Sequence, residues 1–114
     1  MIIMSAKDGK IITTLPLAGS SDGAVFNPKT MEAFSSHSNG TLTIVKETSP
    51  TSFEVEQTLE TMNGARTLTM DPRTGNIYVM SVERRPAPPP PAGGGRGAQA
   101  PVIPGSFTIL MIGR

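Results

Sequence analysis

A single histidine lies in a serine-rich stretch that follows an aspartate. Around His37 stand candidate nucleophiles and a candidate acid: Ser35, Ser36, Ser38 and Asp22. Ser, His and Asp are the residue types of a hydrolytic triad, in which histidine accepts the proton of a serine nucleophile. Nothing in the stretch resembles the strand–turn–helix elbow that presents such a serine. We therefore expect His37 to be a solvated loop residue, and we assign no catalytic residue.

The chain nearly lacks the residues, cysteine and histidine, that most often bind transition metals or form disulfides. The chain has no Cys and one His, which excludes disulfides, Cys nucleophiles and multi-His metal sites. Six of its seven methionines fall in or beside expected strands without clustered spacing, which favours core filling over soft-metal binding. The run Gly93–Gly97 is not followed by the Lys-Ser/Thr of a phosphate loop. We expect no metal site and no cofactor.

Size and charge bound the remaining options. A chain of 114 residues is one ordinary domain. A net charge of +1 argues against nucleic-acid binding and against a polybasic membrane anchor. The apolar opening, Met1–Met4, is far shorter than a membrane span, and no signal peptide follows from it.

The elements that position these residues are predicted to be strands. Alternation of period 2 recurs, most clearly with Phe53, Val55, Gln57 and Leu59 on one side of a strand, whereas helical periodicity is absent. Asp8-Gly9 and Asn39-Gly40 are typical of type I′ hairpin turns. We expect nine strands, near 1–5, 10–17, 23–27, 32–36, 41–47, 53–60, 66–70, 76–82 and 106–112. The last is apolar on both faces, which predicts burial on both.

The strands repeat along the chain. Phe26-Asn27-Pro28-Lys29-Thr30 matches Met70-Asp71-Pro72-Arg73-Thr74 at an offset of 44 residues. A period in the forties with four strands per unit is typical of a β-propeller blade. With strands lettered A to D outward from the central channel, the chain divides into C-D, A-B-C-D and A-B-C. We therefore predict an all-β partial propeller over 1–114 that forms part of a larger ring or assembly.

Three motifs then resemble the YVTN-repeat (YncE-like) propeller family. They are the turn and Tyr-Val strand Asp71–Val79, the hairpin Met4–Gly19 and the Gly-Thr-entered strand Asn39–Val45. Departures include Asn27 for Asp, Phe34 for Tyr and Lys46 for Asp. The resemblance implies a binding or scaffold role rather than a particular reaction. It also implies a periplasmic or secreted parent, although the chain as written suggests a cytoplasmic location.

Residues 84–105 interrupt the last repeat between strands B and C. Their Pro and Gly content predicts a flexible insert, with polyproline II structure at Pro88–Pro91 and a flexible Gly run after it. The favoured interpretation is a tolerated surface loop. A ligand for an aromatic-lined groove and weak anion contact through its arginines are alternatives.

The repeat register predicts which connections share an end of the sheets. Ser20–Asp22, Ser36–Ser38, 63–66 and the insert should lie at one end, and the Pro-containing turns at the other. Asp22 and Arg66 are equivalent by the 44-residue offset, with opposite charge. One interpretation is a rim salt bridge between them. The other is that Arg66 presents its guanidinium to an anionic ligand, so that Arg66, Asp22 and His37 are the candidate contact residues.

We expect a non-catalytic propeller segment of a binding or interaction scaffold for an unknown ligand or protein. The alternative is part of a cofactor-bearing, dehydrogenase-like propeller enzyme whose active-site residues lie in missing blades. Either way, further blades or self-association must cover the apolar strands at the two ends of the segment.

Overall fold

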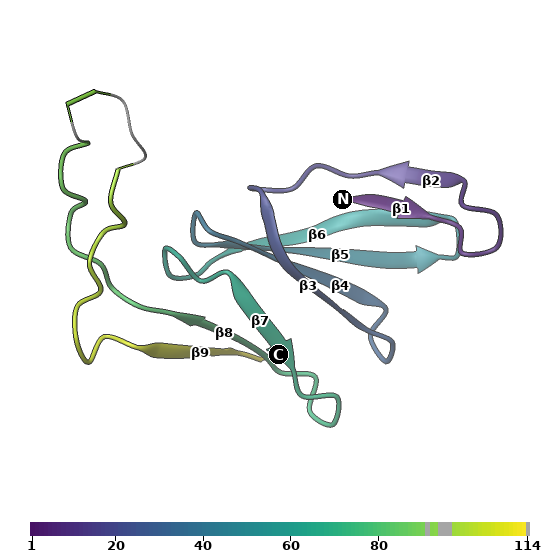
Figure 1. The fold of residues 1–114 in the computed structure, drawn as a ribbon. Coiled ribbons are helices and arrows are strands. Elements are labelled where there is room, and N and C mark those ends of the chain that lie inside the picture. The colour runs from purple at the N-terminus through teal and green to yellow at the C-terminus, as the bar shows by residue number, and fades with distance from the viewer. Residues whose placement is uncertain (91, 94–96, 114) are drawn as a thin grey trace.

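Nine strands form three open antiparallel sheets in the computed structural model, which describes residues 1–90, 92, 93 and 97–113 (Figure 1). The described residues contain no helix. The strands are β1 (Ile2–Met4), β2 (Ile11–Thr14), β3 (Ser21–Asn27), β4 (Glu32–His37), β5 (Thr41–Ser49), β6 (Ser52–Glu60), β7 (Thr67–Met70), β8 (Ile77–Ser81) and β9 (Thr108–Ile112).

The sheets contain two, four and three strands, in the orders β1-β2, β3-β4-β5-β6 and β7-β8-β9. Within each sheet, consecutive strands of the chain pair antiparallel. Short turns bring most of these pairs together, whereas the insert separates β8 from β9. This is the predicted division into C-D, A-B-C-D and A-B-C. The all-β fold class is confirmed, and the open sheets fit a partial β-propeller.

The hairpin turns lie where the sequence predicts them, but their type I′ assignment is wrong. Only the glycine of each pair has a positive φ, 72° at Gly9 and 85° at Gly40, and neither Asp8 nor Asn39 does. The Gly40 N–H donates to the His37 carbonyl at 3.1 Å, which closes a turn that ends on a left-handed glycine. A type I turn followed by such a residue is the common longer hairpin.

The alternation of β6 does not place one set of side chains on a single face. Ile44 of β5 pairs with Gln57, whereas the next residue, Val45, pairs with Val55. One extra residue, Glu56, therefore interrupts the strand as a β-bulge, and a shift of one residue reverses which face each side chain occupies. Gln57 and Leu59 share the face of Ile44, while Phe53 and Val55 lie on the other face.

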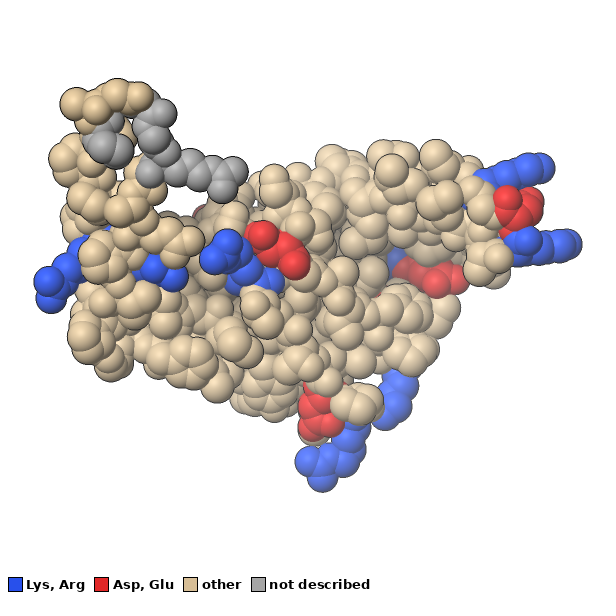
Figure 2. All heavy atoms as spheres, in the orientation of Figure 1, with Lys and Arg blue, Asp and Glu red and all other residues tan. Residues whose placement is uncertain are grey.

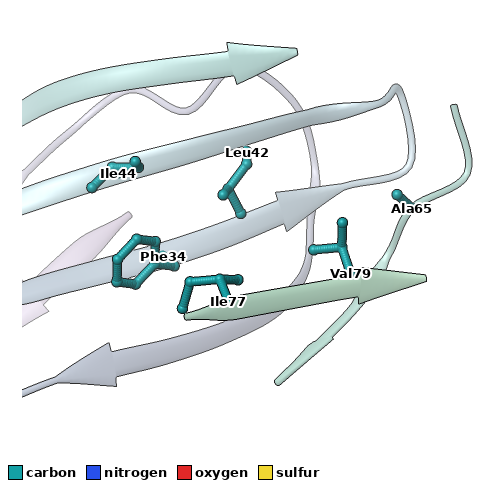
Figure 3. Packing of buried hydrophobic residues seen from close by; sticks show 6 residues of the cluster. All are labelled: Phe34, Leu42, Ile44, Ala65, Ile77 and Val79. Atoms are coloured by element: carbon teal, nitrogen blue, oxygen red, sulfur yellow. The ribbon is translucent and has the colours of Figure 1, made fainter. Parts of the chain in front are cut away.

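The apolar core lies between the four-stranded and three-stranded sheets (Figure 3). Phe34 on β4 and Leu42 and Ile44 on β5 pack toward Ile77 and Val79 on β8. Ala65, in the connection from β6 to β7, closes one end of this cluster. Leu42 and Val79 are fully buried.

Apolar side chains at both ends of the array of sheets remain exposed. On β9, Ile109 is 56% exposed and Met111 is 62% exposed, so the predicted burial of this strand on both faces is wrong. Ile2 and Met4 of β1 are likewise exposed. The chain has 7544 Å² of accessible surface, whereas a compact monomer of 12.0 kDa has about 6,000 Å². The uncovered faces of the outer sheets and the exposed residues of the projecting insert both contribute to this excess.

The insert begins as an extension of the β8–β9 hairpin. Arg84 and Val102 form an isolated antiparallel bridge. The Arg85 N–H donates to the Pro101 carbonyl, and the Ile103 N–H donates to the Glu83 carbonyl, both at 2.9 Å. These bonds form a stem that projects beyond the sheets (Figure 1). Of the predicted polyproline and Gly segments, Pro91 and residues 94–96 lie outside the described residues, so the predicted flexibility stays a prediction.

Candidate functional site

The connections group at two opposite ends of the sheets. The turns β1–β2, β3–β4 and β5–β6 lie toward one end, and the turn β4–β5, the connection β6–β7 and the insert lie at the other (Figure 1). Two hydrogen bonds join the second group. The Ser38 N–H donates to an Asp22 carboxylate oxygen at 2.7 Å, and the Gly64 N–H donates to the Ser38 carbonyl at 2.9 Å. At the first end, Lys29 Nζ donates to the Pro72 carbonyl at 2.7 Å.

His37 is not a solvated loop residue, contrary to the expectation from sequence. It is the last residue of β4 and is 0% exposed. Its Nδ1 lies 3.1 Å from the Ser20 carbonyl oxygen, which can only accept, so Nδ1 carries the proton. Its Nε2 lies 3.0 Å from Thr43 Oγ1, and Thr43 Oγ1 also accepts from the Ala18 N–H at 3.2 Å. The Thr43 hydroxyl proton is then left to donate to Nε2, so both ring nitrogens of His37 and the hydroxyl of Thr43 are hydrogen-bonded.

The serines of the hypothetical triad bind elsewhere. Ser35 Oγ donates to Ser21 Oγ at 2.8 Å, and Ser36 Oγ donates to the Arg66 carbonyl. Neither ring nitrogen of His37 bonds to a serine hydroxyl among the described residues. His37 therefore connects β4 to the chain segment that precedes β3, and the structure gives it no nucleophile to activate.

The equivalent position in the next repeat does the same work with a different side chain. Ser81 ends β8, is buried and lies at the 44-residue offset from His37. Its Oγ donates to the Asn63 carbonyl at 2.7 Å, in the connection that precedes β7. In both repeats, a buried donor at the end of the second strand thus holds the connection that enters the sheet.

The predicted rim salt bridge between Asp22 and Arg66 does not form. The ion pairs seen among the described residues include Lys10–Asp8 and Arg73–Asp71, and neither involves Asp22 or Arg66. The Asp22 carboxylate accepts from the Ser38 backbone instead. This bond caps the β4–β5 turn, and it occupies the Asp22 carboxylate that would have neutralised Arg66. The guanidinium of Arg66 is exposed and has no hydrogen-bond acceptor within the described part of the chain.

A cavity of about 670 Å³ lies beside Arg66, at the end of the sheets that carries the insert. Basic side chains, with an acidic side chain beside them, lie below the insert in this part of the surface, at the left of the view (Figure 2). Four chain segments form the walls: the β4–β5 turn, the connection after β6, the end of β8 with the start of the insert, and the residues that lead into β9. The lining residues are Ser38, Met62, Asn63, Gly64, Arg66, Thr67, Met80, Ser81, Val82, Glu83, Arg84, Ile103 and Phe107.

Sequence reasoning named Arg66 as a contact residue and included Arg84 only among the arginines of the insert, whose anion contact was a lesser alternative, and it missed Phe107. It treated residues 84–105 as one surface loop, although the two ends of the insert pair and line the cavity. The signal was present, because β-branched Val102-Ile103 faces Glu83-Arg84 across a Pro/Gly-rich stretch and can pair with it as a ribbon.

A second hollow, of about 400 Å³, lies at the opposite end, between β6 and the β7–β8 turn. Its lining includes Lys29, Arg73 and the buried Glu32. Nearby, hydrogen bonds from the Arg73 N–H and the Thr74 hydroxyl lower the pKa of Asp71. The described residues contain no cluster of three or more His, Asp or Glu that could hold a metal ion.

Comparisons with family models, curated proteins and solved structures find no match to this chain. Within the described residues, no helix is long and apolar enough to cross a membrane.

Proposed function

We propose that this chain is a non-catalytic segment of a β-propeller that serves as a binding scaffold, as its resemblance to the YVTN-repeat family suggests. The repeat geometry supports this proposal. Sheets of two, four and three strands follow one another, and His37 and Ser81 make corresponding bonds in consecutive repeats. Such a fold presents loops at the ends of its sheets, where contacts with a partner are made.

The observation that carries the proposal is the cavity beside the insert. Its walls come from two neighbouring sheets and from the stem of the insert, so no single hairpin could form it. Apolar Met62 and Phe107 share it with polar Ser38, Arg66 and Arg84. A concave surface with apolar walls and a few polar groups is typical of a ligand site.

The exposed apolar faces support a place in a larger array of blades. Ile109 and Met111 mark one end of the segment, and Ile2 and Met4 the other. A blade of a propeller is stable because its neighbours cover both of its faces. Further blades, or further copies of this chain, would cover these side chains.

Mapping of bound small molecules by NMR tests the assignment of the binding end. We would screen a small-molecule library against the isotopically labelled chain and record backbone shift changes. Ligands should perturb Ser38, Asn63–Thr67 and Val82–Arg84. Perturbations confined to Lys29, Glu32 and Arg73, at the opposite hollow, would contradict the proposal. The Gly40→Ala variant sharpens the test, because the added Cβ would lie 2.9 Å from the Asn63 nitrogen and displace the cavity wall.

A further inference from the structure

The cavity beside the insert contains two guanidinium groups that no carboxylate neutralises. Arg66 and Arg84 both line it, and neither takes part in an ion pair among the described residues. Glu83 also lines the cavity and opposes an anion, but it forms no ion pair with either arginine. Two positive charges against one negative charge leave the site with a net charge of +1.

Arg66 and Arg84 also line a second, smaller hollow together. Its volume is about 140 Å³, and it is lined by Arg66, Arg84, Gln99 and Ala100. The backbones that carry the arginines are held in place, since the Arg66 carbonyl accepts from Ser36 Oγ and Arg84 forms a bridge with Val102. The Arg84 Nη1 atom donates to the Ala100 carbonyl at 2.8 Å, which fixes the direction of its guanidinium and leaves its other N–H groups available.

Apolar side chains line part of the cavity, together with polar ones from Ser38, Asn63, Thr67 and Ser81. Met62, Met80, Ile103 and Phe107 line it, and Phe107 is 61% exposed. An apolar group that covered Phe107 would gain about 25 cal/mol for each Å² removed from water. The arrangement of a charged hollow beside an apolar wall matches a molecule that is anionic at one end and apolar at the other.

We propose that this cavity binds an organic carboxylate with an apolar chain. Arg66 and Arg84 hold the carboxylate, because a guanidinium donates two parallel hydrogen bonds to a carboxylate. Met62 and Phe107 cover the apolar chain. A single negative charge matches the net charge of +1, which favours a carboxylate over a dianionic phosphate. This inference rests on the proposed function and names the ligand class of the same site.

Titration of the full chain with octanoate tests the ligand class, with binding measured by calorimetry and mapped by NMR. Octanoate should perturb Arg66, Thr67 and Arg84, and both acetate and neutral octanol should bind at least about tenfold more weakly. Arg66→Gln and Arg84→Gln should each weaken octanoate binding about tenfold, since a hydrogen bond to a charged group contributes at least that factor. Arg73→Gln, at the opposite end of the sheets, is the matched control and should change nothing.

Several outcomes would overturn this inference. Octanol binding as tightly as octanoate would show that the carboxylate is not recognised, and inorganic phosphate binding as tightly would show a simple anion site. Equal octanoate affinity for the native chain and both arginine variants would place the ligand elsewhere, for instance on Ile109 and Met111. If octanoate fails but other molecules perturb the cavity, the ligand class is wrong and the scaffold proposal survives. If library ligands perturb only the opposite hollow, the scaffold proposal fails as well.

Discussion

The two central strands of the four-stranded sheet, β4 and β5, are buried on both faces, but by different means. Toward β7–β9, the apolar side chains of Phe34, Leu42 and Ile44 fill the middle of the face, and Ser36 donates to the Arg66 carbonyl beside them. Toward the segment that follows β2, His37 and Thr43 form a continuous line of hydrogen bonds to backbone groups. Apolar packing is strong but has little directional preference, whereas a hydrogen bond weakens steeply when its donor and acceptor are not aligned. The first face therefore supplies most of the stability, and the second fixes where the incoming chain lies.

Truncation on the apolar face should have the largest effect. Leu42→Ala should lower the free energy of unfolding by about 3 kcal/mol, because it leaves a cavity between two packed sheets. Denaturant unfolding followed by circular dichroism measures this loss. Ile109→Ala is the control, since Ile109 is already exposed and its truncation should cost far less. Equal losses at the two positions would show that the packing between these sheets does not dominate stability.

Removal of one hydroxyl tests the polar face. Thr43→Val keeps the shape of the side chain but leaves the Ala18 N–H and His37 Nε2 without a partner, which should cost about 2 kcal/mol. Thr58→Val is the matched control, because Thr58 pairs with Thr43 across the sheet and is exposed. A Thr43→Val variant as stable as Thr58→Val would mean that the hydrogen bonds do not hold this face together.

The β3–β4 turn, beside the apolar face, is strained at one residue. Met31 has a φ of 57°, and the residue at the 44-residue offset, Gly75, has a φ of 78°. A side chain in this left-handed region costs about 1 kcal/mol that glycine avoids. Met31→Gly should therefore raise the free energy of unfolding by up to about 1 kcal/mol, and Gly75→Ala should lower it. Thermal melts of both variants measure the change, and a destabilised Met31→Gly would show that the methionine side chain contributes more than the strain costs.

Acid should weaken the equivalent turn slightly. The Arg73 N–H and the Thr74 hydroxyl lower the pKa of Asp71 below its ordinary value of 3.8. A lowered pKa in the folded state means that this stabilisation is complete above the ordinary value and is lost as the pH falls through the folded value. Melts at pH 6 and at pH 2.5 should show a larger decrease for the native chain than for Asp71→Asn, which copies the Asn27 of the preceding repeat. Equal decreases would exclude a contribution from Asp71.

The sequence predicted the strands and their division among sheets because turns and alternation are local signals. It did not predict the bulge at Glu56, because the alternation from Phe53 to Leu59 continues through the extra residue without a break. The burial of His37 was also missed, because its partners, Ser20 and Thr43, come from separate segments that only the folded chain brings together. For the same reason, Arg66 was a candidate from the repeat register, whereas Arg84 required the pairing of the two ends of the insert.

The bonds of His37 and Ser81 to the preceding connections have a consequence for how such a chain can grow. Each bond joins two points of one repeat, Ser20 to His37 and Asn63 to Ser81, and needs nothing from the repeats on either side. Duplication or deletion of a whole repeat therefore leaves the corresponding hydrogen bond in every other repeat intact. Insertion or loss of a 44-residue repeat in the gene could change the number of repeats, and each repeat would still hold the connection that leads into its own sheet. Only the packing between neighbouring sheets would then limit how many repeats can be joined.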